Sequence, residues 1–475
     1  MASAAESIHM RDQSEHGCLG TTSTATELIA FYQNGTLSPV EVFKQSLARI
    51  QDVDEILGAM LVNTSDLGMA QAKHAEQAWR QGSAGPLSGV PVSIKDTFDV
   101  AGFVTTRGSK LHQRQLALED SGVIRRLKAA GAVFVGKTNT AEFGQSATNE
   151  NMLGPVARNP WNIDMTPGGS SGGAAASVAA GYVPLALGAD GGGSIRIPAA
   201  MTGLFGFKPT YGLCSDEGGF RAMSDFCCPG PLSQSVADAR LFMSVLAEKP
   251  FPRRNSKKVL RVGCCLAPEG RPVHPGIRSA IASAATLLSD LGHIVTEVNP
   301  NFKGWAEAFG PLVLAEEWRE RGYLLERCKE VFTDYEISSL IGGSKLTPDM
   351  VSHARALHQQ YRERIASLFD QFDFLLTPTV ALPAFEIGTR PTEIDGKPVG
   401  RLWGAFPFTA LFNVAGTPAA AMPCGLVDGL PVSVQLVAPL GKDGDLLDLA
   451  ENLEEAMDFR NQYLIPHIRL HLSHG

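Results

Sequence analysis

Short, fully apolar segments alternate with helical segments along most of the chain, and this alternation limits the fold more than any other feature of the sequence. A predicted helix at 121–130 precedes a strand at 132–135, and a helix at 174–180 precedes a strand at 183–187. Strands without polar residues are typical of a parallel sheet that helices cover on both faces. The sequence therefore predicts an α/β fold with a central mixed, mostly parallel β-sheet and helices on both faces.

The same pattern extends to the C-terminal end, with one interruption. Further helices are predicted at 24–50, 67–80, 235–246, 277–291, 405–414 and 444–457, and further strands at 89–96, 259–265, 293–298, 374–376, 419–422 and 432–436. Residues from about 302 to 371 are charged and helical, which indicates a helical insertion or cap on the substrate side. We expect a single domain at 23–475 after a flexible, polar N-terminus at 1–22.

Composition and charge exclude several classes of protein. Hydrophobic residues make up 44% and charged residues 19% of the chain, and the net charge of −8 provides no basic surface for nucleic acid. We find no signal peptide and no apolar run long enough to span a membrane. The eight cysteines show no CxxC or metal-ligand spacing. We expect a cytoplasmic protein with reduced thiols and with neither a cofactor nor a metal.

One motif matches the phosphate-binding P-loop in its letters only. The segment GAVFVGKT at 131–138 fits the pattern, but a P-loop needs a strand before its first glycine and an exposed loop between the glycines. Here a predicted helix precedes Gly131, and the intervening residues are apolar. We therefore interpret the segment as a buried strand with a lysine near its end.

A second motif matches the nucleophile elbow of α/β-hydrolases. The segment GGSSG at 168–172 has the required letters, but the residues before it, NPWNIDMTP, contain two prolines and cannot form the strand that the elbow needs. None of the histidines stands in a distinctive context. A Ser-His-Asp triad is therefore the minority interpretation.

Glycine and serine are concentrated in two clusters, 168–173 and 191–194, within the segment 166–198. Successive amide groups at 191–194 are suited to receive an oxyanion, although a plain glycine-rich turn has the same composition. Without a histidine, lysine is the chemical option for a base, because burial favours its neutral form. Lys95 ends an apolar strand where a crevice is expected, and a solvated strand-end lysine remains the alternative.

These residues belong to longer segments that resemble the amidase signature family of serine amidohydrolases. The resemblance extends over residues 25–458 and rests on the segments PLSGVPVSIKDTFDVAG, GAVFVGKTNTAEFG, RNPWN, GGSSGGAAASVAAGYVPLALGADGGGSIRIPAA, GLFGFKPTYG, GPLSQSVADA, FDFLLTP, FTALFNVAGTPAAAMPCG and GLPVSVQLVAP. Agreement of so many segments over most of the chain is specific to this family and is not explained by chance. It implies the amidase signature fold and hydrolysis of amides.

The resemblance also implies a Ser–cis-Ser–Lys triad. Lys95 matches the family's base, Ser170 the bridging serine after a cis peptide bond from Gly169, and Ser194 the nucleophile. The oxyanion donors implied are the N–H groups of Gly191, Gly192, Gly193 and Ser194. The residues expected to orient the loops are Ser171, Asp190 and Arg196. Gly191 stands where a threonine is commoner in the family.

The substrate pocket is the part that the sequence describes least. We expect walls from the unusual segment at 214–229 and from apolar side chains near it. The side chains expected to line the pocket are Tyr211, Phe226, Trp403 and Phe406.

The resemblance leaves two functions open. The first is a monomeric or homodimeric amidohydrolase for a small or hydrophobic amide, with a carbamate, anilide or ester as further substrates. The second is the amidase subunit of glutamyl-tRNA amidotransferase. Such subunits carry an SSNLARYDG-like stretch that this chain lacks between about 310 and 345, which favours the first function.

Overall fold

The computed structural model describes residues 22–220, 222–254 and 258–462. The N-terminal segment that we predict to be flexible, 1–22, lies outside the described residues except for Thr22. None of the described helices combines the length and the apolar character that crossing a membrane requires.

Eleven strands of the described chain form one sheet, in the order β1-β3-β2-β4-β6-β5-β12-β13-β9-β7-β8. Their bounds are β1 Met60–Asn63, β2 Pro91–Lys95, β3 Val133–Thr138, β4 Leu185–Asp190, β5 Phe205–Lys208, β6 Cys228–Ser233, β7 Arg261–Cys264, β8 Ile294–Glu297, β9 Phe374–Pro378, β12 Ala419–Val427 and β13 Leu430–Val437. A separate hairpin consists of β10 Glu393–Ile394 and β11 Lys397–Pro398.

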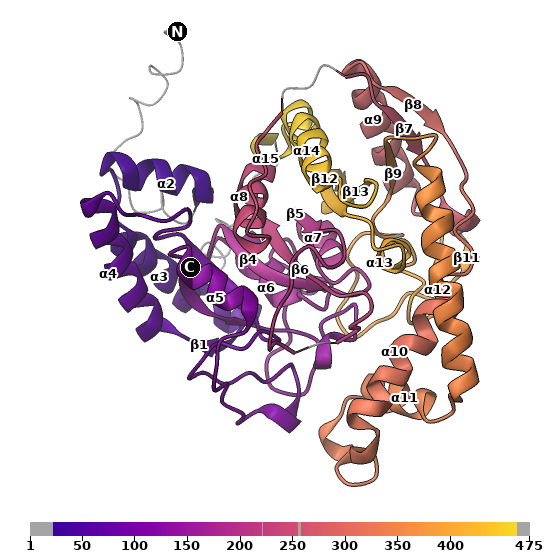
Figure 1. The fold of residues 1–475 in the computed structure, drawn as a ribbon, viewed down its shortest axis with the longest axis horizontal. Coiled ribbons are helices and arrows are strands. Elements are labelled where there is room, and N and C mark those ends of the chain that lie inside the picture. The colour runs from indigo at the N-terminus through magenta and orange to yellow at the C-terminus, as the bar shows by residue number, and fades with distance from the viewer. Residues whose placement is uncertain (1–21, 221, 255–257, 463–475) are drawn as a thin grey trace.

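Helices surround this sheet (Figure 1). Those of seven residues or more have the bounds α2 Ala25–Asn34, α3 Pro39–Leu57, α4 Ser65–Gln81, α5 Gly122–Ala129, α6 Gly172–Ala179, α7 Arg196–Thr202, α8 Val236–Leu246, α9 Pro275–Asp290, α10 Trp305–Arg321, α11 Asp334–Gly343, α12 Pro348–Leu368 and α14 Asp443–Met457. The shorter ones are α13 Ala410–Val414 and α15 Phe459–Gln462.

The α/β class and the mixed central sheet are confirmed. Parallel pairing joins β2 to β3 and β4, and joins β7 to β8 and β9, so it lies in the two outer parts of the sheet. The middle strands, from β6 to β13, pair antiparallel. A tight turn through Asp428 and Gly429, both with positive φ, makes β12 and β13 a hairpin.

Strand β4 shows how the sheet separates two cores. Leu185 and Leu187 belong to the core cluster that also contains residues of α5, α8, α9 and α14, whereas Ala186 belongs to the cluster that contains residues of α3, α4 and α6. Successive side chains of a strand point to opposite faces, so a fully apolar strand needs helices on both sides. The predicted covering of both faces is confirmed.

Two local features have clear causes. The helical segment predicted at 24–50, with a break at Gly35, forms two helices, α2 and α3, because Gly35 adopts a φ of 75° and ends the first one. Strand β6 was not predicted, because Pro229 and Pro231 interrupt its pattern and proline lacks the N–H group of a regular strand.

Helices α10, α11 and α12 occupy the sequence between β8 and β9 and lie at one side of the sheet in Figure 1. α10 packs against α11, α12 and α13. Two hydrogen bonds tie these helices to the loop after β3: the Gln145 side chain donates to Glu317, and the Thr333 N–H donates to Glu142 over 2.7 Å. The helical segment thus borders the residues that follow β3.

Candidate active site

Lys95 and Ser170 meet at the carboxyl end of β2. Parallel pairing with β3 and β4 places Lys95 inside the sheet, where it is 1% exposed. Its Nζ donates a hydrogen bond of 2.7 Å to Oγ of Ser170, a fully buried residue. The peptide bond between Gly169 and Ser170 is cis, as the family resemblance implies. A lysine and a serine far apart in sequence thus form one buried pair.

Ser194 lies on the loop between β4 and α7. Its carbonyl oxygen accepts a hydrogen bond of 3.2 Å from the N–H of Ser171, so the two serine segments are joined through their backbones. Ser194 is 8% exposed, and it lines one pocket of about 170 Å³ with Lys95 and Ser170. The hydrogen bonds of the described residues do not include one between the Ser170 and Ser194 hydroxyls.

Burial of Lys95 has an electrostatic consequence. Loss of hydration disfavours its charged form and lowers the pKa of Lys95 to about 8, although Cys227 and Asp190 act in the opposite direction. A neutral amine is therefore available at mildly alkaline pH. Burial raises the pKa of Cys227, which also lines the pocket, to about 12, so that thiol remains neutral.

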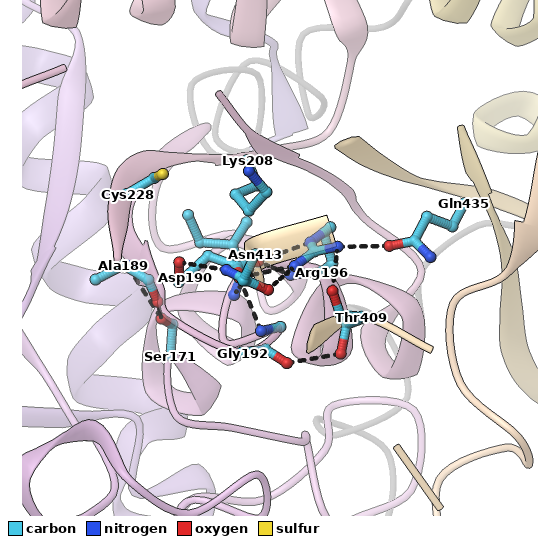
Figure 2. A network of polar contacts seen from close by, with 12 residues as sticks. Ser171, Ala189, Asp190, Gly192, Arg196, Lys208, Cys228, Thr409, Asn413 and Gln435 are labelled. Carbon is cyan, nitrogen blue, oxygen red and sulfur yellow. Dashed lines mark hydrogen bonds and ion pairs between the residues drawn. The ribbon is translucent and has the colours of Figure 1, made fainter. Parts of the chain in front are cut away.

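A buried ion pair holds the loop that carries Ser194 (Figure 2). The Arg196 Nε and Nη2 each donate to one carboxylate oxygen of Asp190 over 2.9 Å, and both side chains are fully buried. Arg196 also donates to Gln435 and Asn413 over 2.6 Å and to the Thr409 carbonyl over 3.0 Å. Burial raises the pKa of Asp190, but the attraction of Arg196 outweighs it and holds the pKa well below its usual range.

The four expected oxyanion donors are not equivalent. The Gly193 N–H donates to Asp190 over 2.8 Å, so it is occupied within the loop and the expectation for this residue is wrong. Among the described residues, no acceptor pairs with the N–H groups of Gly191, Gly192 and Ser194. These three N–H groups remain available. The fourth, that of Gly193, is bound by the carboxylate of Asp190, which also orders the turn into α7.

Ser171 and Thr409 support the same loops from two sides. The Ser171 hydroxyl donates to the Ala189 carbonyl over 3.3 Å, which ties the first serine cluster to β4. The Thr409 hydroxyl donates to the Gly192 carbonyl over 2.7 Å (Figure 2). The Ala189 carbonyl also accepts a hydrogen bond of 3.4 Å from the Lys95 Nζ, so the first of these contacts lies beside the Lys95–Ser170 pair.

The expected aromatic walls divide into three groups. Tyr211 lines the pocket, and its hydroxyl donates to the Ser224 carbonyl over 2.8 Å. Trp403 lines a neighbouring pocket instead. Phe226 packs against Phe309, and Phe406 is fully buried in the main core, so neither is a wall of the pocket that holds Ser194. Sequence hydrophobicity cannot separate core aromatics from pocket aromatics.

The structure adds wall residues that the sequence did not single out, among them four with larger apolar or thiol side chains. Phe220, Met223 and Cys227 come from the segment at 214–229, for which a pocket wall was expected as a whole. Phe143, from the loop after β3, carried no recognisable signal. Phe143, Phe220 and Met223 add apolar surface to a pocket that also has polar walls.

The lysine of the P-loop-like segment has another partner. Lys137 lies on the buried strand β3, and its Nζ forms an ion pair of 2.6 Å with Asp96. The interpretation of this segment as a strand is confirmed. Within the described ranges, no three His, Cys, Asp or Glu side chains are grouped so as to hold a metal ion.

Comparisons with known proteins show the family and the fold of this chain. The model of the amidase family matches residues 41–447. A glutamyl-tRNA(Gln) amidotransferase component of Pseudomonas fluorescens is 33% identical over 92% of this chain and 98% of its own length. A bacterial aryl acylamidase of the amidase signature family superposes with a TM-score of 0.86 at 28% identity, over 94% of this chain and 99% of its own. An amidase of known structure has the same TM-score at 31% identity, over 92% of this chain and 100% of its own.

Proposed function

Because the chain belongs to the amidase family, we propose that it hydrolyses the C–N bond of a small or hydrophobic amide through an acyl-enzyme on Ser194. The observation that carries the proposal is the buried hydrogen bond between Lys95 and Ser170, beside a serine that reaches the same pocket. A nucleophile, a bridging hydroxyl and a base with a lowered pKa are the parts that acyl transfer without histidine requires.

In the proposed acylation, neutral Lys95 accepts a proton from Ser170 while Ser170 accepts one from Ser194. The Ser194 oxygen forms a bond to the acyl carbon, and the π electrons of the carbonyl move onto its oxygen. The N–H groups of Gly191 and Gly192 and of Ser194 itself stabilise that oxyanion. Stabilising charge that exists only in the tetrahedral state lowers the barrier without tightening substrate binding.

Collapse of the tetrahedral state breaks the C–N bond. The proton held by Lys95 passes through Ser170 to the leaving nitrogen, which departs as a neutral amine. Water then attacks the acyl-enzyme, and a proton from the water passes through Ser170 to Lys95. The carboxylic acid leaves when the proton returns to Ser194.

The pocket supports the proposed substrate class. Phe143, Phe220 and Met223 contribute apolar surface to the pocket, and the pocket volume of about 170 Å³ suits a small acyl or amine group. Carbamates, anilides and esters present the same electrophilic carbon and are proposed as further substrates. A monomer or a homodimer would suffice, since all the proposed groups come from one chain.

A second candidate function rests on the relative from Pseudomonas fluorescens. Its 33% identity over nearly its whole length favours a role as the amidase component of a larger assembly. The segment at 310–345 favours the first function instead, because it forms parts of α10 and α11 with a sequence unlike the SSNLARYDG-like stretch of such subunits.

Gel filtration of the purified chain combined with an amidase assay separates the two. We expect the chain alone to hydrolyse simple amides and anilides, and we expect Ser194→Ala protein to be inactive. A panel of amides, esters and carbamates that vary in acyl and amine size then defines the substrate class. A chain that is inert alone and gains activity only with partner subunits would overturn the first function.

A further inference from the structure

A second cavity adjoins the pocket that holds Ser194. It has a volume of about 560 Å³ and shares Phe143, Phe220 and Ser224 with that pocket. Its other walls come from α10 and from the loops around Arg107 and Gly218. A substrate longer than the catalytic pocket would extend past the two phenylalanines into this space.

Arg107, in this cavity wall, is held by the segments that carry the catalytic groups. Its N–H donates to the carbonyl of Asp96, the residue after Lys95, over 3.0 Å. Its own carbonyl accepts from the N–H of Phe143 over 2.8 Å. The backbone of Arg107 is therefore fixed relative to both pockets, so its side chain starts from a defined position.

The guanidinium of Arg107 lacks a carboxylate partner among the described residues. Its Cζ lies 4.5 Å from the centroid of the Phe220 ring, and its buried Nε has no hydrogen-bond acceptor in the described chain. Burial lowers the pKa of Arg107; Asp99 and Asp96 oppose this shift, and the charge of Arg321 adds to it. Stacking on Phe220 engages the face of the guanidinium, whereas a carboxylate binds at its N–H edge.

The other charged groups of the cavity have partners. Arg321 donates to Glu336 over 2.8 Å, and Arg319 forms an exposed ion pair of 3.0 Å with Glu320. Glu316 accepts a hydrogen bond of 2.8 Å from the Ser224 N–H. Arg107 is therefore the arginine of this cavity whose guanidinium has no carboxylate within ion-pair distance in the described chain.

We propose that Arg107 binds a carboxylate at the end of the substrate remote from the scissile bond, so that the preferred substrates are amides with a terminal carboxylate. This inference rests on the proposed amidase function. The apolar walls of Phe143 and Phe220 take the chain between the amide and the carboxylate. A partly desolvated arginine without an ion-pair partner gains more from such a carboxylate than an exposed arginine does.

Two matched series of substrates test the proposal on both sides of the amide. The first compares p-nitroanilides of succinic, glutaric and adipic acids with those of butyric, valeric and caproic acids. The second compares butyramides of ω-amino acids with butyramides of the alkylamines of equal length. The measured quantity is the ratio of kcat/KM for the charged substrate to that for its neutral counterpart.

For the wild type, we expect kcat/KM of at least one charged substrate to exceed that of its neutral counterpart. The ratio should fall at least about tenfold in Arg107→Gln and recover partly in Arg107→Lys. Arg114→Gln is the matched control, because Arg114 is exposed on the same segment and does not line the cavity. The proposal would be overturned if the wild type had no preference for charged substrates. It would also be overturned if Arg107→Gln lowered kcat/KM equally for charged and neutral substrates.

A binding experiment separates this proposal from the proposed function. The same charged amides are titrated by calorimetry into Ser194→Ala protein and into Ser194→Ala/Arg107→Gln protein. Binding that weakens at least about tenfold without Arg107 supports the carboxylate site even if hydrolysis is never observed. Equal binding by both proteins, or no binding, contradicts it, whereas wild-type cleavage of neutral anilides still supports the amidase.

Discussion

The Nζ of Lys95 lies 2.7 Å from the Oγ of Ser170, although the two residues are 75 positions apart in the sequence. Both are buried, so the hydrogen bond between them is not shared with bulk water. The pair therefore depends on the packing of β2 against β4 and of the first serine cluster against both strands.

The pH dependence of hydrolysis follows from the Lys95 pKa of about 8. Only the neutral amine accepts a proton, so kcat/KM for an uncharged amide should rise about tenfold per pH unit below 8 and level off above it. Lys95→Arg should be inactive at every pH, because arginine keeps its proton. A wild-type profile with its midpoint near 6.5 would point to a histidine base instead.

The two serines should differ in their chemistry. Ser194→Ala and Ser170→Ala should each lower kcat/KM about 10³-fold or more, since each interrupts nucleophilic attack or proton transfer. A fluorophosphonate should label the wild type, should not label Ser194→Ala, and should label Ser170→Ala slowly, as mass spectrometry would show. Ser83→Ala, at an exposed position, is the control. Undiminished labelling of Ser194→Ala would show that another residue is the nucleophile.

The buried pair of Asp190 and Arg196 should matter for stability. Asp190→Asn leaves the Arg196 charge unbalanced, and we expect a loss of about 3–5 kcal/mol in the free energy of unfolding, measured in urea at pH 7. In the control, Glu76→Gln removes the half-buried partner of the exposed Arg80 and should cost about 0.5 kcal/mol or less.

The acid side of the stability profile checks the same pair. The pKa of Asp190 is lower in the folded than in the unfolded chain, so its stabilising effect is complete above the ordinary carboxyl range. It is lost as the pH falls through the lowered folded pKa. The stability difference between wild type and Asp190→Asn should therefore be constant above the ordinary carboxyl range and should shrink as the pH falls below it. A difference that stays constant down to acid pH would contradict the assignment.

Gly193 should tolerate no side chain. Its φ is 126°, and a Cβ there would lie 2.6 Å from the Cβ of Thr409. We expect Gly193→Ala to displace the loop and to lower kcat/KM about 100-fold, with lower stability. Gly154→Ala, where a Cβ meets no atom within 4 Å and φ is not positive, should behave like the wild type in both assays. Full activity of Gly193→Ala would show that the loop adapts.

Much of the fold could be predicted because its signals are local. The apolar run that ends at Lys95 predicts a buried strand, and β2 is such a strand. The Thr24–Glu27 capping box predicts the start of a helix, and both of its hydrogen bonds are present. Strand β6 escaped prediction because its pairing, and not its residue pattern, makes it a strand.

The sequence by itself determined the α/β class, the two serine clusters and the resemblance to the amidase family, because composition, periodicity and motifs are properties of neighbouring residues. The tertiary structure decided which of these groups meet. It placed Ser170 against Lys95, gave the Gly193 N–H to Asp190, buried Phe226 and Phe406 in the core, and left Arg107 facing a cavity. Distance, burial and hydrogen-bond partners arise only when distant segments pack together, and they determine the pKa of Lys95.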